Sequence, residues 1–230
     1  IDGNSTFGKD FGMQLYPKLS ASYILSDMSW WPDWSESFKL RAAMGEAGKA
    51  PGAFDAVRSW APVAAKEGKP AFTPATVGDP NLGPERTREY EVGFDASFLQ
   101  GRLTSEVNLF LQRTNDALVP VAPIPSLGFS TPQLSNIGVL ENKGLEVSVN
   151  AGLLTGRLLQ WDAGVAYSLA KPKALDLGGR SITINTDGVQ VREGYPVPSY
   201  FGWKVTNPDE KAAPIIEKDV FNGAVWHDRS

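Results

Sequence analysis

Few side chains of this 230-residue chain have the types and spacing that covalent chemistry requires. The strongest match is Ser168-Leu169-Ala170-Lys171, in which a lysine one helical turn after a serine could activate it as a nucleophile. That chemistry needs the serine at the start of a helix. Here Ser168 closes an alternating, strand-like run, and Pro172 disfavours helix at the residue before it. We therefore attribute the match to chance.

The other residues that could carry catalysis or bind a metal are sparse. The chain has no cysteine and a single histidine, His227, near its end, which we interpret as a solvated tail residue. The sequence thus predicts no disulfide, no catalytic residue, no metal site and no cofactor. The net charge is −4 and no basic stripe is present, which argues against nucleic acid as a partner.

Aromatic side chains in Pro-rich segments are the remaining candidates for ligand contact. Trp60 and Phe72 lie in residues 50–84, and Trp203 closes the run GYPVPSYFGW. We take these three as candidate ligand-binding residues, with loop packing as the alternative. Three further indoles, Trp30, Trp31 and Trp34, could stack on carbohydrate. Beside strand ends they are more typical of an interfacial girdle or a packed turn.

The elements that would position these residues are strands. From Tyr90 to Phe98 apolar and polar residues alternate, which is the period of a strand with one apolar face. After Leu99-Gln100-Gly101 the alternation resumes with Leu103, Val107, Leu109 and Leu111 on the apolar face. Two long strands joined by so few residues predict an antiparallel hairpin.

The composition of the polar face separates two all-β architectures. A soluble sandwich would also alternate, but acidic and amide side chains crowd this face: Glu89, Glu91, Asp95, Glu106, Asn108 and Gln112. Such a face is unusual on an exposed sheet and normal inside a wide barrel. About ten tilted residues cross a bilayer core, which these strands can do. No window approaches 18 consecutive apolar residues, so a membrane crossing would be by strands.

The same patterns give the whole organisation. We predict an all-β antiparallel meander, part of a transmembrane β-barrel with long outer loops and short periplasmic turns, as one partial barrel domain over residues 1–230. The expected strands are 15–25, 37–47, 87–99, 102–113, 143–153 and 158–168, with a small hairpin at 181–191. Residues 50–84 and 114–141 are predicted as long loops, 194–203 as an aromatic loop, and no element is predicted after Lys204.

Several of these stretches together resemble TonB-dependent outer-membrane receptors of the SusC/RagA type. The resemblance is carried by Asn81 to Gly93 (NLGPERTREYEVG), by Asn142 to Glu146 (NKGLE) and by GYPVPSYFGWKV, and it covers roughly residues 15–205. It implies the C-terminal part of a barrel of about 22 strands. It also implies a bacterial outer-membrane location, import of oligosaccharides or peptides energised by the TonB system, a possible SusD-like lipoprotein lid, and contact with outer-membrane lipid.

The chain departs from that family pattern in ways that leave two hypotheses open. We expect the signal peptide to be missing or already removed, and we expect no plug domain, TonB-contact segment or C-terminal aromatic strand in this stretch. About seven strands cannot close such a barrel. The chain is therefore expected to be a fragment of such a transporter. The alternative is a stand-alone β-protein derived from such a barrel, acting as a binding or structural subunit of a larger assembly.

Overall fold

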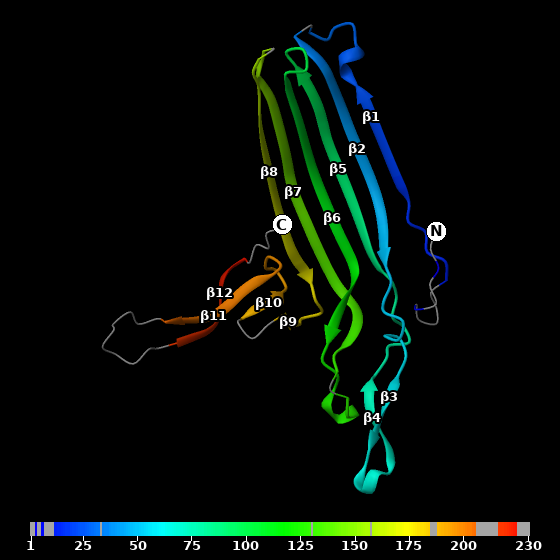
Figure 1. Cartoon of the computed structure of the whole chain (residues 1–230). Helices are drawn as coiled ribbons and strands as arrows, with labels where there is room; N and C mark the ends of the chain where they lie inside the picture. The colour runs from blue at the N-terminus through cyan, green and yellow to red at the C-terminus, as the bar shows by residue number, and fades with distance from the viewer. Residues whose placement is uncertain are drawn as a thin grey trace, which may run out of the picture.

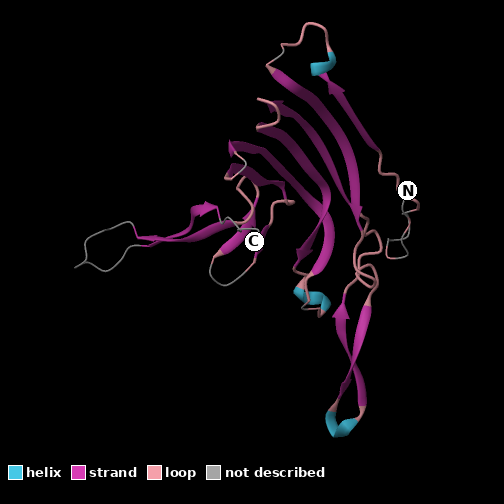
Figure 2. Cartoon of the chain, turned by 45° about the horizontal axis from the view of Figure 1, so that its top comes forward, coloured by secondary structure: helices cyan, strands magenta, loops and turns pink. Residues whose placement is uncertain are grey.

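A curved six-stranded antiparallel sheet dominates the computed structural model of the chain (Figures 1 and 2). The structure describes residues 3, 6, 12–32, 34–129, 131–156, 158–184, 188–205 and 216–224. The strand order is β1-β2-β5-β6-β7-β8. The bounds are β1 Lys18–Ile24, β2 Ser35–Lys49, β5 Glu85–Phe98, β6 Leu103–Val121, β7 Gln133–Thr155 and β8 Gln160–Asp176.

This sheet confirms the predicted fold class, an all-β antiparallel meander in which each strand pairs with the next strand of the same sheet along the chain, although the sheet does not close on itself. The register also confirms that the predicted apolar residues share a face. Phe94 lies opposite Val107 on β6, which lies opposite Val147 on β7. Val149 in turn lies opposite Val165 on β8. The parity of each strand therefore places side chains from all four strands on one side.

The prediction of a long loop over residues 114–141 was wrong, because β6 and β7 continue well past the last alternating residue. The two strands stay paired as far as Val121 and Gln133, around irregularities between Thr114 and Leu118. Asp116 takes a positive φ of 54° in this stretch. Such bulges interrupt the period of two that identifies a strand in sequence.

Residues 50–84 were also wrongly predicted to be irregular. They contain a two-stranded ribbon of β3 Ser59–Ala64 and β4 Pro70–Thr76, which projects from one end of the sheet in Figure 1. Three prolines, Pro62, Pro70 and Pro74, lie within its strands. A two-stranded ribbon accepts them because each strand has one unpaired edge, where a missing N–H costs no ladder bond.

A second sheet, of order β12-β11-β10-β9, follows the main one. Its strands are β9 Ser181–Thr183, β10 Val189–Arg192, β11 Ser199–Val205 and β12 Ile216–Ala224. β9 and β10 pair within the predicted hairpin, whereas β11 replaces the predicted aromatic loop and β12 lies where no element was expected. Where this sheet meets the main one, a small core forms from Ala117, Val119, Ala174, Leu177 and Val191.

The opposite end of the main sheet has shorter connections. Residues 99–102 join β5 to β6, and the first three of them, Leu99, Gln100 and Gly101, take positive φ angles. The carboxylate of Glu36 accepts hydrogen bonds from the backbone N–H groups of Gln100 and Gly101. Arg102 donates to the carbonyl oxygens of Gly152 at 2.9 Å and Leu153 at 3.1 Å, which ties this turn to the end of β7. No helix among the described residues is long and apolar enough to cross a membrane.

Candidate functional site: the two faces of the main sheet

The apolar face is continuous across all six strands. Successive rows follow the pairing, for example Ala21–Ala42–Val92–Leu109–Leu145–Leu169. These side chains are largely uncovered: Val92 is 59%, Leu109 55% and Val165 71% exposed. A face this wide and this apolar needs a non-aqueous neighbour.

Charged side chains replace the apolar ones on this face at the end that carries the long loops. Lys143 and Lys171 face each other across β7 and β8, and the next row runs Glu46–Arg88–Arg113–Glu141–Lys173. Arg86 follows on β5. We call the six cations the basic rows: Arg86, Arg88, Arg113, Lys143, Lys171 and Lys173. They mark one border of the apolar band.

Aromatic rings gather at the opposite border. Trp31 packs on Phe38 at 5.2 Å, Phe38 stacks on Phe94 at 5.1 Å, and Trp34 stacks on Phe98 at 5.7 Å. The indole N–H of Trp31 donates to the carbonyl oxygen of Ser35 at 2.9 Å. Trp34 remains 68% exposed. Since Phe38, Phe94 and Phe98 belong to the apolar face, these rings extend it, as in an interfacial girdle that also packs the turn.

The polar face carries a network of ion pairs that links three strands. Asp95 on β5 accepts from Lys39 and from Arg41 on β2, each at 2.8 Å, and Arg41 also reaches Glu106 on β6 at 2.8 Å. The acidic residues had been placed on this face from sequence. Lys39 and Arg41 likewise alternate with Phe38 and Leu40 in the sequence, but only the structure shows which acidic residues they meet.

Nearer the long loops the polar face carries acidic side chains and two adjoining grooves. A groove of about 430 Å³ is lined by Lys18, Ser20, Glu89, Glu91 and Gln112, among others. Glu89, Glu91 and Glu146 have no ion-pair partner among the described residues. An adjoining groove of about 310 Å³ includes Arg41 and Asn108. This surface can hold polar, hydrogen-bonding groups.

The residues considered for catalysis are not arranged for it. Ser168 and Lys171 both lie on β8, where residues three apart point to opposite faces of a sheet. Ser168 pairs with Glu146 of the polar face and Lys171 with Lys143 of the apolar face. His227 lies outside the described residues. In the part of the chain that the structure describes, no cluster of His, Cys, Asp and Glu could hold a metal ion.

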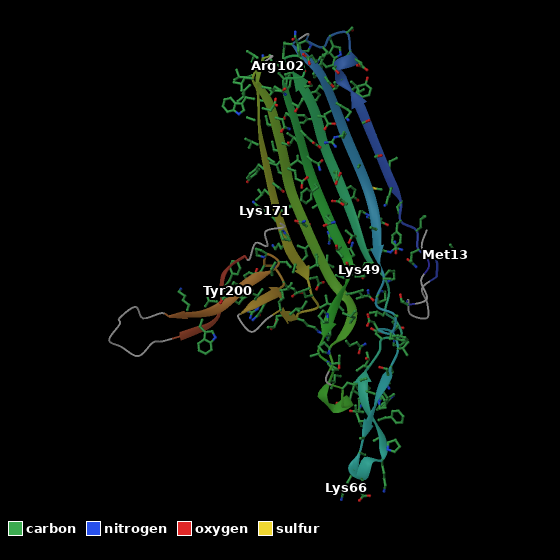
Figure 3. All side chains as sticks on the ribbon, in the orientation of Figure 1. Met13, Lys49, Lys66, Arg102, Lys171 and Tyr200 are labelled. Carbon is green, nitrogen blue, oxygen red and sulfur yellow. The ribbon has the colours of Figure 1, made fainter. Side chains whose placement is uncertain are left out.

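The three candidate ligand-binding aromatics fall on two separate sheets. Trp60 on β3 and Phe72 on β4 occupy one face of the ribbon, since Trp60 pairs with Pro74 and Phe72 with Pro62. Trp60 packs on Phe129 at 5.8 Å, whereas Phe72 is 71% exposed. Trp203 lies on β11 of the four-stranded sheet and is 65% exposed. Figure 3 shows Lys66, at the ribbon tip, far from Tyr200 on β11.

A sheet of long antiparallel strands, apolar on one face and polar on the other, with loops of unequal length at its ends, defines a segment of a wide β-barrel. Comparison with known proteins agrees. The chain belongs to the TonB dependent receptor-like β-barrel family, whose pattern it matches over residues 1–228. This confirms the family to which the sequence motifs pointed.

Curated relatives carry the same family name. The chain is 29% identical over its whole length to TonB-dependent receptor P26 of Formosa agariphila. It is also 28% identical, over 70% of its length, to TonB-dependent receptor SusC of Bacteroides thetaiotaomicron. It spans 25% of the first protein and 17% of the second.

Among solved structures, the RagAB peptide transporter has the same fold. The superposition gives a TM-score of 0.79 at 18% sequence identity and covers 93% of this chain and 26% of the matched one. The RagAB peptide importer in its open-open state gives 0.78 over 96% of this chain. The arrangement of strands is therefore shared although most side chains differ.

Proposed function

We propose that this chain forms part of the barrel wall of a TonB-dependent outer-membrane transporter. The apolar face meets lipid, and the polar face lines the lumen through which nutrients such as oligosaccharides or peptides pass. The observation that carries the proposal is the continuous apolar face with aromatic rings at one border and charges at the other. The location in the bacterial outer membrane follows from this role and from the family.

The height of the apolar band suits a bilayer. On β5 it runs from Phe98 to Tyr90, eight residue steps. At ~3.4 Å per step this is roughly 27 Å along the strand, and a tilt of about 40° reduces it to roughly 21 Å. Outer-membrane barrels have apolar bands about 25 Å tall. A soluble sandwich would need a second sheet of equal extent over this face.

Partners follow from the same proposal. We infer coupling to the TonB system and a SusD-like lipoprotein lid over the end with long loops, as parts of the transport cycle of the whole protein. The β3–β4 ribbon and the four-stranded sheet extend from that end of the main sheet (Figure 1). They are the parts of this chain that a lid or an incoming ligand would meet first.

Accessibility of attached nitroxides tests the proposal. The chain has no cysteine, so single cysteines can be introduced within it without removing others. In bilayers containing the full protein, labels at Val107 and Val147 should collide with oxygen dissolved in lipid. Labels at Asn108 and Ser148, the next residue on each strand, should collide with a water-soluble nickel chelate. Labels at Val107 and Val147 that neither reagent reaches would favour the alternative, a stand-alone subunit with this face buried in protein.

The aromatic candidates remain part of this proposal. Phe72 is the better probe of ligand contact, because its ring is exposed whereas Trp60 packs on Phe129. We expect Phe72→Ala to lower uptake of the transported nutrient severalfold in cells expressing the full protein, with unchanged barrel stability. Leu127→Ala, also exposed near this end, serves as the control. Unchanged uptake in Phe72→Ala would remove Phe72 from the binding surface.

A further inference from the structure

We propose that the basic rows of the apolar face form a docking surface for the phosphate groups of anionic lipids in the leaflet on the long-loop side. The inference rests on the membrane-embedded barrel proposed above. It assigns a role to six cations that transport through the lumen would not use, because they lie on the opposite face of the sheet from the polar grooves.

The position of these cations fits the headgroup level. Lys143 lies opposite Leu111, and Leu111 opposite Tyr90, so the first basic row begins within the last apolar row. Lys143 is 63% exposed at its side chain. A lysine at the border of an apolar band keeps its methylene groups on the apolar surface and extends its ammonium toward the headgroups. The phosphates of a lipid leaflet would lie at the same height.

Like charges face each other twice within this surface. Arg88 is directly opposite Arg113, and Lys143 is directly opposite Lys171. Side chains directly opposite on neighbouring strands are about 4.5–5.5 Å apart at Cβ, and like charges there are destabilising. An anion between each pair would convert that repulsion into attraction, and a phosphate accepts from two cations at once.

The acids of the same surface are too few to neutralise it. Glu46 is buried and is held by Arg88 and, at 3.6 Å, by Arg86. Glu141 lies opposite Arg113 and Lys173 on the neighbouring strands, but its one ion pair among the described residues is with Lys143, at 3.8 Å. Among the described residues, Arg113, Lys171 and Lys173 have no ion-pair partner. Six cations and two carboxylates give this surface a formal charge of +4, whereas the whole chain carries −4.

Anionic lipid is the occupant to which these observations point. The basic rows are continuous with an apolar face that acyl chains would cover, so one lipid molecule can satisfy both surfaces. Each Lys or Arg near an anionic bilayer surface contributes enough to strengthen binding about fivefold, and the effect decreases with salt.

The test compares two double variants of the full protein, each losing two cations. Arg113→Gln/Lys171→Gln removes cations from the basic rows that have no ion-pair partner. Lys66→Gln/Lys69→Gln removes two from the exposed tip of the β3–β4 ribbon, away from the apolar band. Native mass spectrometry during titration with phosphatidylglycerol, and separately with phosphatidylcholine, gives the dissociation constant of each lipid. A nitroxide at Val107, measured in bilayers, reports separately whether the apolar face meets lipid.

We expect the unmodified protein and the ribbon-tip variant to bind phosphatidylglycerol more tightly than phosphatidylcholine. In Arg113→Gln/Lys171→Gln the dissociation constant for phosphatidylglycerol should rise at least about fivefold, with that for phosphatidylcholine unchanged. Equal affinity of the unmodified protein for the two lipids, or no change in this variant, overturns the inference. With Val107 still accessible to lipid-dissolved oxygen, that failure leaves the proposed function standing. A label at Val107 that lipid does not reach overturns both.

Discussion

Single side chains in this sheet owe their environment to strand parity. Val147 and Ser148 are neighbours on β7, yet the first lies opposite Val107 and Tyr167 and the second opposite Glu106 and Ala166. One step along the chain thus moves a side chain from the apolar to the polar face. The loss of stability caused by a charged substitution should therefore alternate from one residue to the next along a strand.

Val147→Arg should destabilise the barrel by about 2–4 kcal/mol, because it places a charge near the middle of the apolar band. Leu111→Arg, in the row that borders the cations, should cost only about 0–1 kcal/mol. Ser148→Arg is the matched control, since its guanidinium would lie opposite Glu106. Urea unfolding in lipid vesicles, followed by tryptophan fluorescence, measures the differences. Equal losses for Val147→Arg and Ser148→Arg would contradict a lipid-facing band.

Glu46→Gln should lower the free energy of unfolding by about 1–2 kcal/mol. Glu46 is buried, but the side chain of Arg88 is 52% exposed, so the cost lies between those of exposed and buried ion pairs. Glu141→Gln, whose pair with Lys143 spans 3.8 Å, should cost less than about 0.5 kcal/mol. The same unfolding measurement applies to both variants. A larger loss in Glu141→Gln than in Glu46→Gln would contradict the expectation that the buried carboxylate contributes more to stability.

At a few glycines, a neighbouring strand lies so close that there is no room for a side chain. A Cβ added at Gly144 would lie 2.2 Å from the carbonyl oxygen of Leu169 on β8 and 2.6 Å from the ring of Phe110 on β6. At Gly164 the nearest atom is the Asn150 side-chain oxygen, at 2.5 Å. Both glycines lie on the polar face, but only the first meets backbone at such a distance. The β7–β8 pairing therefore depends on Gly144 having no side chain.

We expect Gly144→Ala to destabilise the sheet by about 1–3 kcal/mol, since a strand must shift to admit the methyl group. Gly164→Ala should cost less than about 1 kcal/mol, because the Asn150 amide can rotate away. The midpoints of thermal unfolding of the two variants in detergent test this. A lower midpoint for Gly164→Ala than for Gly144→Ala would contradict it.

At the scale of the whole molecule, the described part of the chain is a wide sheet with little core. Its compact apolar cluster, around Ala117, Ala174 and Leu177, lies where the four-stranded sheet meets the main sheet and does not cover the main sheet's apolar face. The edge of β8 is covered only near its end, where Val197 donates to the carbonyl oxygen of Pro172 at 3.0 Å. A large apolar face and a long open edge both favour association.

We therefore expect residues 1–230, expressed alone, to aggregate in plain buffer and to give a sheet-rich species only in detergent or lipid. Size-exclusion chromatography and circular dichroism distinguish these outcomes. A monodisperse, sheet-rich protein without detergent would instead support the stand-alone binding or structural subunit.

The sequence by itself determined the strands of the main sheet and their two faces. The alternation of apolar and polar residues can be seen within each strand's own sequence, and paired strands show the same alternation. It also placed Glu91 and Asp95 on the polar face. Local order alone could not show where alternation gives way to bulges, so the extensions of β6 and β7 were missed. The proline-containing β3–β4 ribbon was missed because a strand with one free edge tolerates residues that normally end strands.

Only the tertiary structure decided which charges meet. Arg41 with Glu106, Arg88 with Glu46, and Lys143 opposite Lys171 are each separated in sequence and joined by register across strands. The register of two strands depends on the turn that joins them. A shift of one strand by one residue against its neighbour would have placed its charged side chains on the other face. The paired network on the polar face and the excess of cations on the apolar face follow from that register, which no single stretch of sequence specifies.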